Sequence, residues 1–366
     1  MRQVRVAIIG TGSSIGNHLD ALHSLGDAVD LVAAVDVDEA RVKAFADQNQ
    51  IPHWFTNATE MLNAIHPDLV CIVTPPATHL ALTLECLEAG AWVHCEKPLC
   101  ASLAEFDQIE QAEARTGRYV STVFQWRFGS AVERLRGLMH SGELGQPLVG
   151  LCQTLWYRNL AYYQVAWRGK WATEIGGPTM TLGIHLMDLF LWLMGDWSEV
   201  QAMIGTLDRP IEVEDVSMAL VRFASGAMGT ITNSALSPRQ NSIMRLDFQR
   251  ATVEVSALYR YNNTNWSYSI PDGSPDAEAL QRWQNIQQDI SGNHAAQLTA
   301  LLSSMEKNER PLISGLEARR ILEFAASLYK AAITRQAVQR GSITAADPFY
   351  YAMNGQPLAT SKRVLR

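Results

Sequence analysis

The sequence predicts two domains of different fold class: an α/β domain with a parallel sheet, then an α+β domain with a large, mostly antiparallel sheet. In the first third, short apolar strand patterns alternate with helical ones. Those strands are near-continuous runs of Val, Ile and Ala, which is typical of parallel sheets covered by helices on both faces. Beyond about residue 125 the segments are longer and half-alternating, which indicates an antiparallel sheet.

The predicted elements follow one another in a regular order. In the first domain we expect strands over residues 4–10, 29–36, 68–76 and 91–98, and helices over residues 17–25, 38–48 and 78–90. In the second we expect strands over residues 200–205, 216–224, 226–236, 243–248 and 251–256, and helices over residues 181–195 and 314–336. The predicted domains are therefore residues 1–124 and 125–345, with a partly extended tail over residues 346–366.

Composition excludes several classes of function. The chain has 366 residues, and 47% of them are hydrophobic. It carries 30 basic and 37 acidic residues and has no basic tract. We therefore expect neither nucleic acid nor an anionic membrane as a partner. No apolar run reaches the roughly 18 residues of a spanning helix, and the start resembles a strand rather than a signal peptide. Five cysteines without a CxxC pair indicate neither disulfides nor zinc. We expect a cytoplasmic protein without a metal.

A glycine-rich turn joins the first strand to the first helix. It reads GTGSSIG, the context in which a dinucleotide pyrophosphate binds at a helix N-terminus. Gly10 allows the tight turn, and Gly12 lets the backbone approach the phosphates. A strict GxGxxG motif would place its third glycine at Ile15, so an ordinary glycine-rich turn is the alternative. The expected cofactor contacts here are Gly10, Thr11, Gly12, Ser13, Ser14 and Ile15.

An acidic residue at the end of the second strand supports the dinucleotide interpretation. Asp36 stands where a carboxylate accepts hydrogen bonds from the adenosine ribose hydroxyls. Asp38 and Glu39 follow, and no arginine adjoins Asp36 in the sequence, so a 2′-phosphate would be repelled. We therefore predict a Rossmann domain that binds NAD, with NADP less favoured. Asp36 could instead cap the next helix, but Asp38 can serve as that cap.

The third strand ends in the segment VTPPATH. Its prolines cannot continue a strand ladder, so the chain turns at the carboxyl edge, where ligands bind in open α/β sheets. The expected cofactor contacts at this turn are Thr74, Pro75, Pro76 and His79. His79 could equally begin the next helix without contacting the cofactor.

The fourth strand ends in Glu96, Lys97 and Pro98. A lysine at this edge, beside a dinucleotide, can hydrogen-bond a substrate oxygen and stabilise a developing alkoxide. Pro98 keeps the preceding residue extended, so Lys97 would be held in one direction. A surface ion pair after an edge strand is the alternative, but the strand is too apolar for an edge.

Taken in order, these motifs resemble the glucose–fructose oxidoreductase/inositol dehydrogenase (Gfo/Idh/MocA) family. The segments that carry the resemblance are GTG with His18, Asp36, TPPATH, CEKP and GGPTMTLGIHLMD, and the match runs from about residue 3 to about residue 340. The resemblance implies that Glu96 and Lys97 lie at the mouth of the nicotinamide pocket. It also implies that Ile15 replaces the third glycine, because His18 stands where the family usually has a histidine.

A second group of polar residues lies in the apolar helix expected over residues 181–195. Thr181, His185 and Asp188 have the spacing of one helical stripe, and buried ionisable groups are costly unless paired or functional. A core histidine is the alternative. By resemblance, His185 is the general acid/base, and Asp188 places the substrate or orients the site. Thr181 stands where many family dehydrogenases have an aspartate, and a hydroxyl cannot balance an imidazolium charge.

Other residues are expected to line the site. By resemblance, Gln125 lies at the domain junction in the cofactor cleft, and Trp167 and Arg168 contact nicotinamide or substrate. Tyr163 belongs to an aromatic, hydroxyl-rich loop that could stack on a sugar ring or could simply pack. His294 is expected to begin a helix rather than take part in chemistry.

These observations and the resemblance predict an NAD-dependent oxidoreductase acting on a secondary alcohol of a sugar, sugar derivative or cyclic polyol. His185 would take the hydroxyl proton while Lys97 steadies the oxygen and hydride passes to nicotinamide. The alternatives are a glycosidase that oxidises its substrate transiently with NAD, and a regulator that binds the dinucleotide without turnover. Half-apolar strands leave one sheet face needing cover, and relatives associate through this sheet, so we expect a homodimer or homotetramer.

Overall fold

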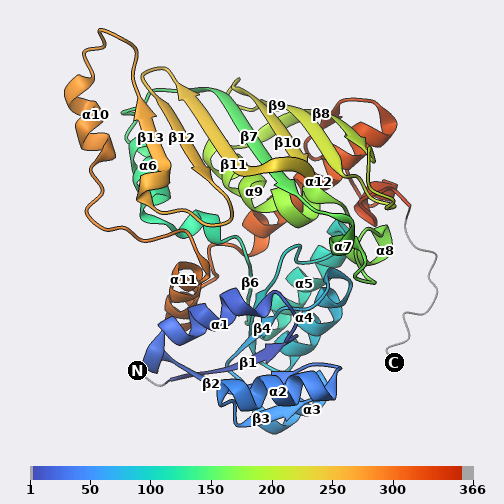
Figure 1. The fold of residues 1–366 in the computed structure, drawn as a ribbon. Coiled ribbons are helices and arrows are strands. Elements are labelled where there is room, and N and C mark those ends of the chain that lie inside the picture. Colours follow the sequence, from blue (N-terminus) through green and yellow to red (C-terminus); the bar gives the residue numbers. More distant parts are fainter. Residues whose placement is uncertain (1–2, 357–366) are drawn as a thin grey trace. The chain divides into compact units, whose positions relative to one another are not determined.

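The computed structural model of the protein describes residues 3–356, which form two compact units (Figure 1). Unit 1 consists of residues 3–100, 105–125 and 293–319. Unit 2 consists of residues 101–104, 126–292 and 320–356. Among residues 3–356, no helix combines the length and the apolar character that crossing a membrane requires.

Unit 1 contains the predicted parallel sheet. Its strand order is β3-β2-β1-β4-β5-β6, and all five neighbouring pairs are parallel. The strands are β1 (Val4–Ile9), β2 (Val29–Val35), β3 (His53–Phe55), β4 (Leu69–Ile72), β5 (Trp92–Cys95) and β6 (Val120–Thr122). The order reverses between β1 and β4, which is the switch point where ligands bind in such sheets. Since β5 pairs with β4 and β6, the strand before Lys97 is interior, as predicted.

Six helices accompany this sheet, and one of them comes from late in the chain. They are α1 (Ile15–Ser24), α2 (Glu39–Asn49), α3 (Ala58–Ile65), α4 (His79–Glu88), α5 (Leu103–Thr116) and α11 (His294–Lys307). In Figure 1, α11 lies beside α1, and its Leu298 and Leu301 join the buried cluster of Val6 on β1. The structure therefore differs from the expected division at residue 124, because the apolar face of α11 packs in the core of unit 1.

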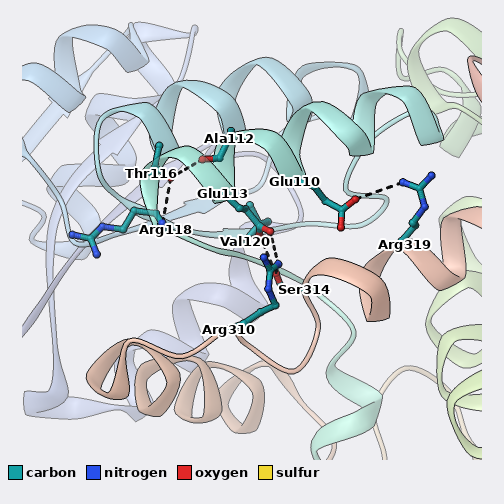
Figure 2. Close-up of polar contacts among 9 residues, drawn as sticks. All are labelled: Glu110, Ala112, Glu113, Thr116, Arg118, Val120, Arg310, Ser314 and Arg319. Carbon is teal, nitrogen blue, oxygen red and sulfur yellow. Dashed lines mark hydrogen bonds and ion pairs between the residues drawn. The ribbon is translucent and has the colours of Figure 1, made fainter.

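A buried carboxylate ties the late segment to α5. Glu113 is 2% exposed, and its Oε1 accepts hydrogen bonds from the backbone N–H of Val120 at 2.8 Å and from the hydroxyl of Ser314 at 2.9 Å. Its Oε2 forms an ion pair with Arg310 (Figure 2). Because every carboxylate oxygen has a partner, this burial joins β6, α5 and the segment before α12 without an uncompensated charge.

Unit 2 contains the predicted mostly antiparallel sheet. The strand order is β13-β12-β11-β7-β10-β9-β8-β14, and the pair β7–β10 is parallel. The strands are β7 (Pro147–Tyr157), β8 (Trp197–Gly205), β9 (Val216–Phe223), β10 (Met228–Ser234), β11 (Leu236–Phe248), β12 (Thr252–Ala257), β13 (Trp266–Ser269) and β14 (Val338–Gln339). Burial alternates along β9 and β10, so one face of the sheet is packed and the other is open.

Helix α9 (Ile184–Met194) packs against β7 and β11 of this sheet. The helices of unit 2 are α6 (Ser130–His140), α7 (Leu160–Tyr163), α8 (Trp171–Glu174), α9, α10 (Ala277–Gln284) and most of α12 (Gly315–Thr334). A Cβ at Gly150 of β7 would lie 2.5 Å from the ring of Phe190 on α9, so glycine allows helix and sheet to approach closely. The result is a rigid support for α9, which carries His185 and Asp188.

The sequence predicts a partly extended tail over residues 346–366. The structure describes this segment up to residue 356. Residues 348–350 form a short 3₁₀ helix, and the side chains of Phe349 and Met353 are buried. Up to residue 356 the segment predicted as a partly extended tail thus contains one short helix, and the burial of these two apolar side chains stabilises it. Residues 357–366 of the predicted tail lie outside the described residues.

Candidate active site

The glycine-rich turn has the geometry that its sequence predicts. Gly10 has a φ of +98°, and a Cβ there would lie 2.5 Å from the carbonyl oxygen of Val73, so no larger residue fits. A Cβ at Gly12 would meet no protein atom within 4 Å, so packing within the chain does not require glycine there. The following two serines are exposed, and α1 begins at the buried Ile15.

Asp36 is fixed by the same turn. Its Oδ2 accepts hydrogen bonds from both the backbone N–H and the hydroxyl of Thr11, each at 2.9 Å. Its Oδ1 accepts the backbone N–H of Asp38 at 3.1 Å, and Asp38 caps α2 by accepting from Arg41 N, as predicted. The carboxylate is therefore held at the end of β2, beside the turn.

The preference for NAD was predicted partly because no arginine stands beside Asp36 in the sequence, but the fold brings Arg41 next to it. The Nη2 of Arg41 lies 3.5 Å from Asp36 and 3.0 Å from Asp38, although no arginine adjoins Asp36 in the sequence. The first turn of α2 brings this guanidinium back to the end of β2. A cation that can meet a 2′-phosphate is therefore present beside the acids.

His79 connects two strand ends instead of facing outward. It is fully buried, and its ring nitrogens lie 2.7 Å from the carbonyl oxygen of Pro98 and 2.8 Å from that of Thr74. Burial lowers the pKa of His79, whereas the two carbonyl acceptors favour its protonated form. This position favours the second of the two roles considered for His79: it begins α4 and holds the β4 and β5 ends together.

Glu96 lies among histidines from distant parts of the chain. Its Oε1 is 2.8 Å from Nε2 of the fully buried His18 on α1 and 3.7 Å from Nε2 of His294 on α11. Its Oε2 accepts the backbone N–H of Lys97 at 3.2 Å. Burial alone would raise the pKa of Glu96, but the hydrogen bonds from the histidines and the nearby charges hold it well below the ordinary value. Glu96 is therefore an ionised, oriented group beside Lys97.

The same three side chains could be considered as metal ligands. Their donor atoms lie within 4.8 Å of one another. A metal on Nε2 of His18 would require the proton on Nδ1, and that buried atom has no hydrogen-bond partner among the described residues. An Nε2–H donated to Glu96 leaves Nδ1 unprotonated, so the hydrogen-bonded arrangement fits the surroundings better.

The polar residues of the apolar helix do not share one regular helix. Residues 179–183 form a π-helical turn, and α9 starts at Ile184. The hydroxyl of Thr181 donates to the carbonyl of Gly177 at 2.9 Å, a bond that an ionised aspartate could not make. Gly183 is required because a Cβ would lie 1.8 Å from the side chain of Asn233. Such π-turns occur often at functional sites.

Asp188 has a partner that the sequence did not suggest. Both of its oxygens accept from Arg127, at 2.6 Å from Nε and 2.5 Å from Nη2, and both side chains are 1% exposed. The guanidinium also lies over the ring of Trp192, 4.9 Å from its centroid. This arrangement favours an orienting role for Asp188, one turn from His185, over direct substrate contact.

A cavity of about 10 Å³, enough for one water molecule, adjoins His185. Trp126, Trp156 and Tyr259 line it, and the rings of His185 and Tyr259 are 5.8 Å apart. The edge-to-face packing against Tyr259 fixes the orientation of the imidazole. Neither Trp126 nor Tyr259 could be predicted from the sequence, because Trp126 lies far before α9 and Tyr259 far after it, outside any helical or strand period that includes His185.

Arg168 and its neighbours form a stacked loop within unit 2. The guanidinium of Arg168 lies 3.8 Å from the ring centroid of Tyr162 and 4.3 Å from that of Trp167. It also contacts Glu174 at 3.2 Å. Burial raises the pKa of Glu174, and it raises the pKa of Tyr163 too. The charge of Arg168 is thus already balanced within the loop.

Gln125 ends the second segment of unit 1. Its side chain is 1% exposed, and neither its amide nitrogen nor its oxygen has a hydrogen-bond partner among the described residues. Buried amides normally have partners, so this position is unusual, and the cofactor contact expected for Gln125 stays a prediction.

The parallel sheet, its switch point, the glycine turn and the acid at the end of β2 define unit 1 as a dinucleotide-binding Rossmann domain. Comparison with known families agrees: the oxidoreductase family with an NAD-binding Rossmann fold matches residues 4–124, and the GFO/IDH/MocA C-terminal domain matches residues 132–257. The chain belongs to the Gfo/Idh/MocA family of oxidoreductases.

Relatives with established names are dehydrogenases. D-apiose dehydrogenase of Paraburkholderia graminis is 24% identical over 365 residues, which cover 95% of this chain and 92% of that protein. The NAD⁺-dependent scyllo-inositol 2-dehydrogenase of Bacillus subtilis is 29% identical over 248 residues, covering 66% and 70%. The WlbA dehydrogenase of Chromobacterium violaceum, solved with NADH and UDP-GlcNAcA, has a TM-score of 0.82 and 25% identity, covering 94% and 98%.

Proposed function

We propose that this protein is an NAD-dependent dehydrogenase that transfers hydride between nicotinamide and a secondary hydroxyl or ketone of a sugar, sugar derivative or cyclic polyol. The observation that carries the proposal is the held acid at the β2 end, within a chain whose named relatives oxidise sugars and inositols. The residues of the glycine turn would bind the pyrophosphate, and Asp36 would bind the adenosine ribose. Bound NAD supplies the hydride acceptor.

Two side chains are proposed to act on the reacting hydroxyl. Lys97 follows an interior strand, next to the ionised Glu96, and would stabilise negative charge on the substrate oxygen. His185 projects from α9 at the water-sized cavity and would take the hydroxyl proton. The hydroxyl oxygen gives its proton to His185 while the carbon that bears this oxygen gives a hydride to NAD, so the alcohol becomes a ketone. Thr181, Asp188, Arg168 and Tyr163 would bind or orient the substrate.

The test is a screen of sugars and cyclic polyols with NAD, followed by nicotinamide absorbance. Reduction of NAD by at least one of them supports a dehydrogenase. Glycoside cleavage without net NADH formation would instead indicate the family's glycosidase chemistry. Tight NAD binding without any turnover would indicate a regulator, the alternative that Thr181 keeps open.

The cofactor preference gives a separate prediction. NAD should bind more tightly than NADP, because Asp36 and Asp38 repel a 2′-phosphate. Asp36→Asn should lower the ratio of the NADP and NAD dissociation constants by about tenfold or more, which corresponds to about 1.4 kcal/mol. Arg41 would then be released toward the phosphate. Titration of both cofactors by fluorescence measures this. Arg41→Ala is the matched control, and should weaken NADP binding while sparing NAD; equal affinities in the unmutated protein would contradict the assignment.

We further propose a homodimer, or a tetramer built from dimers, that forms through the open face of the unit 2 sheet. Met203, Met218, Leu220 and Met228 on this face are 76%, 54%, 60% and 55% exposed. Met203 and Met218 are cross-strand neighbours, so the apolar surface is continuous across β8 and β9. The free, buried thiols of all five cysteines support a reducing compartment, most simply the cytoplasm.

The oligomer prediction can be checked by light scattering at micromolar concentration. The unmutated protein should be a dimer or tetramer, and Leu220→Glu should dissociate it because the charge would be buried in the interface. Leu316→Glu provides the control, since Leu316 lies on α12 and is 80% exposed. A monomeric unmutated protein would end this proposal.

A further inference from the structure

Arg158 differs from the other arginines in its part of unit 2. Arg168 contacts Glu174, and Arg209 contacts Asp208, so each of these two charges is paired. Among the described residues, no carboxylate lies within ion-pair distance of Arg158, so no ion pair balances the charge of its guanidinium. The Nη1 of Arg158 donates to the neutral oxygens of Tyr157 at 2.9 Å and Gln240 at 3.3 Å, and the side chain also hydrogen-bonds to the phenol of Tyr162.

Two aromatic rings hold this guanidinium in place. Its central carbon lies 4.9 Å from the ring centroid of Trp156 and 5.2 Å from that of Tyr162. The indole of Trp156 is fixed in turn by donating to Ser242 at 2.9 Å. Stacking of this kind orients a guanidinium without consuming its charge, so the planar fork of donors stays available to an oxyanion.

The held cation shares an aromatic neighbour, Trp156, with the cavity beside His185. Trp156 lines the same cavity as His185, so a single indole ring connects Arg158 with that cavity. Tyr259 completes the link, with its ring 6.0 Å from Trp156 and 5.8 Å from His185. All these residues belong to unit 2. Arg158 is partly exposed, so a ligand can reach it from solvent.

We infer that Arg158 is an anion-recognition residue and that the preferred substrate is an acidic sugar, carrying a carboxylate or a phosphate in addition to the hydroxyl that is oxidised. This inference rests on the proposed dehydrogenase function. A charge-assisted, two-pronged hydrogen bond from Arg158 would hold the oxyanion. The sugar ring would extend from the bound oxyanion toward His185. A secondary hydroxyl, rather than the acidic group, would then lie at the reacting position.

The experiment uses the full-length protein with NAD and matched neutral and acidic ligands. Glucose is compared with glucuronate, gluconate and glucose 6-phosphate, and inositol is compared with inositol phosphate. We expect kcat/KM to be at least about tenfold higher for the acidic member of a pair. Arg158→Gln should remove this preference, mainly by raising KM for the acidic member of each pair. Arg158→Lys should restore part of it, because the charge returns without the fork. Comparing carboxylates with phosphates identifies which oxyanion is recognised.

Arg134→Gln is the matched control. Arg134 lies on α6 and also donates to neutral carbonyl oxygens, those of Arg282 and Trp283, so its removal should not change the preference. Calorimetric titration of the protein–NADH complex with glucuronate, glucose 6-phosphate and glucose gives an answer that does not depend on turnover. Equal binding of neutral and acidic ligands, or the same ratio in Arg158→Gln, would overturn the inference. A lack of NAD reduction with every sugar would count against the dehydrogenase function instead.

Discussion

Lys97→Ala should lower turnover by about 10²–10⁴-fold, the usual contribution of a general acid/base step, and His185→Ala should lower it to a similar extent. Both variants should bind NAD nearly as well as the unmutated protein, because neither residue belongs to the glycine turn or to the β2 end. The physical reason is that each is proposed to stabilise the reacting hydroxyl rather than the bound ground state. Steady-state kinetics, together with titration of NADH binding, measure the two effects separately.

The double variant and two surface controls sharpen this prediction. Because Lys97 and His185 would serve one transition state, their combined loss should be smaller than the product of the single losses. Lys43→Ala and His53→Ala remove the same side chains from exposed positions and should leave turnover unchanged. If both active-site variants turned over an identified substrate at the original rate, the proposed site would be wrong.

Asp188→Asn should lower the free energy of unfolding by about 3–5 kcal/mol, because it leaves Arg127 buried without its counter-charge. The two side chains are each 1% exposed and joined by two short hydrogen bonds, so water cannot replace the lost carboxylate. Turnover should also fall, since α9 carries His185 one turn away. Urea unfolding of the full-length protein, read by circular dichroism, measures the change.

A surface pair provides the matched control. Asp196 pairs with Arg320 and Arg340, each at 2.8 Å, but its side chain is 56% exposed. Asp196→Asn should therefore cost less than about 1 kcal/mol. Replacing both buried partners, as Arg127→Met with Asp188→Leu, should recover much of the stability while leaving turnover low. Equal losses for Asp188→Asn and Asp196→Asn would show that the buried pair is not the cause.

Local sequence patterns were sufficient to predict the strands and helices near the cofactor turn. β1, β2, β4 and β5 each have a continuous apolar run and a polar end, so both the element and its functional edge are visible. β3 and β6 have three residues each and were not predicted, because so short a run has no recognisable period.

Contacts in the site that arise from turns or tertiary packing could not be predicted from the sequence. Arg41 is five residues from Asp36 and meets it only through the turn into α2. A 3.6-residue period was assumed for Thr181 and His185, but the packing of Gly183 against Asn233 accompanies a π-turn that breaks it. His294 was correctly expected to begin a helix, yet its position near Glu96 follows from tertiary structure alone.

The origin of α11 has a consequence for the order in which the protein can assemble during synthesis. Leu298 and Leu301 complete the core cluster of unit 1, and Arg310 and Ser314 complete the partners of Glu113. None of these four residues has been translated when the six strands of the first sheet have already left the ribosome. The dinucleotide-binding unit is thus begun first but finished only after most of unit 2 exists. In the nascent chain, the apolar flank around Val6 lacks partners that lie nearly three hundred positions downstream, and Glu113 lacks partners that lie about two hundred positions downstream.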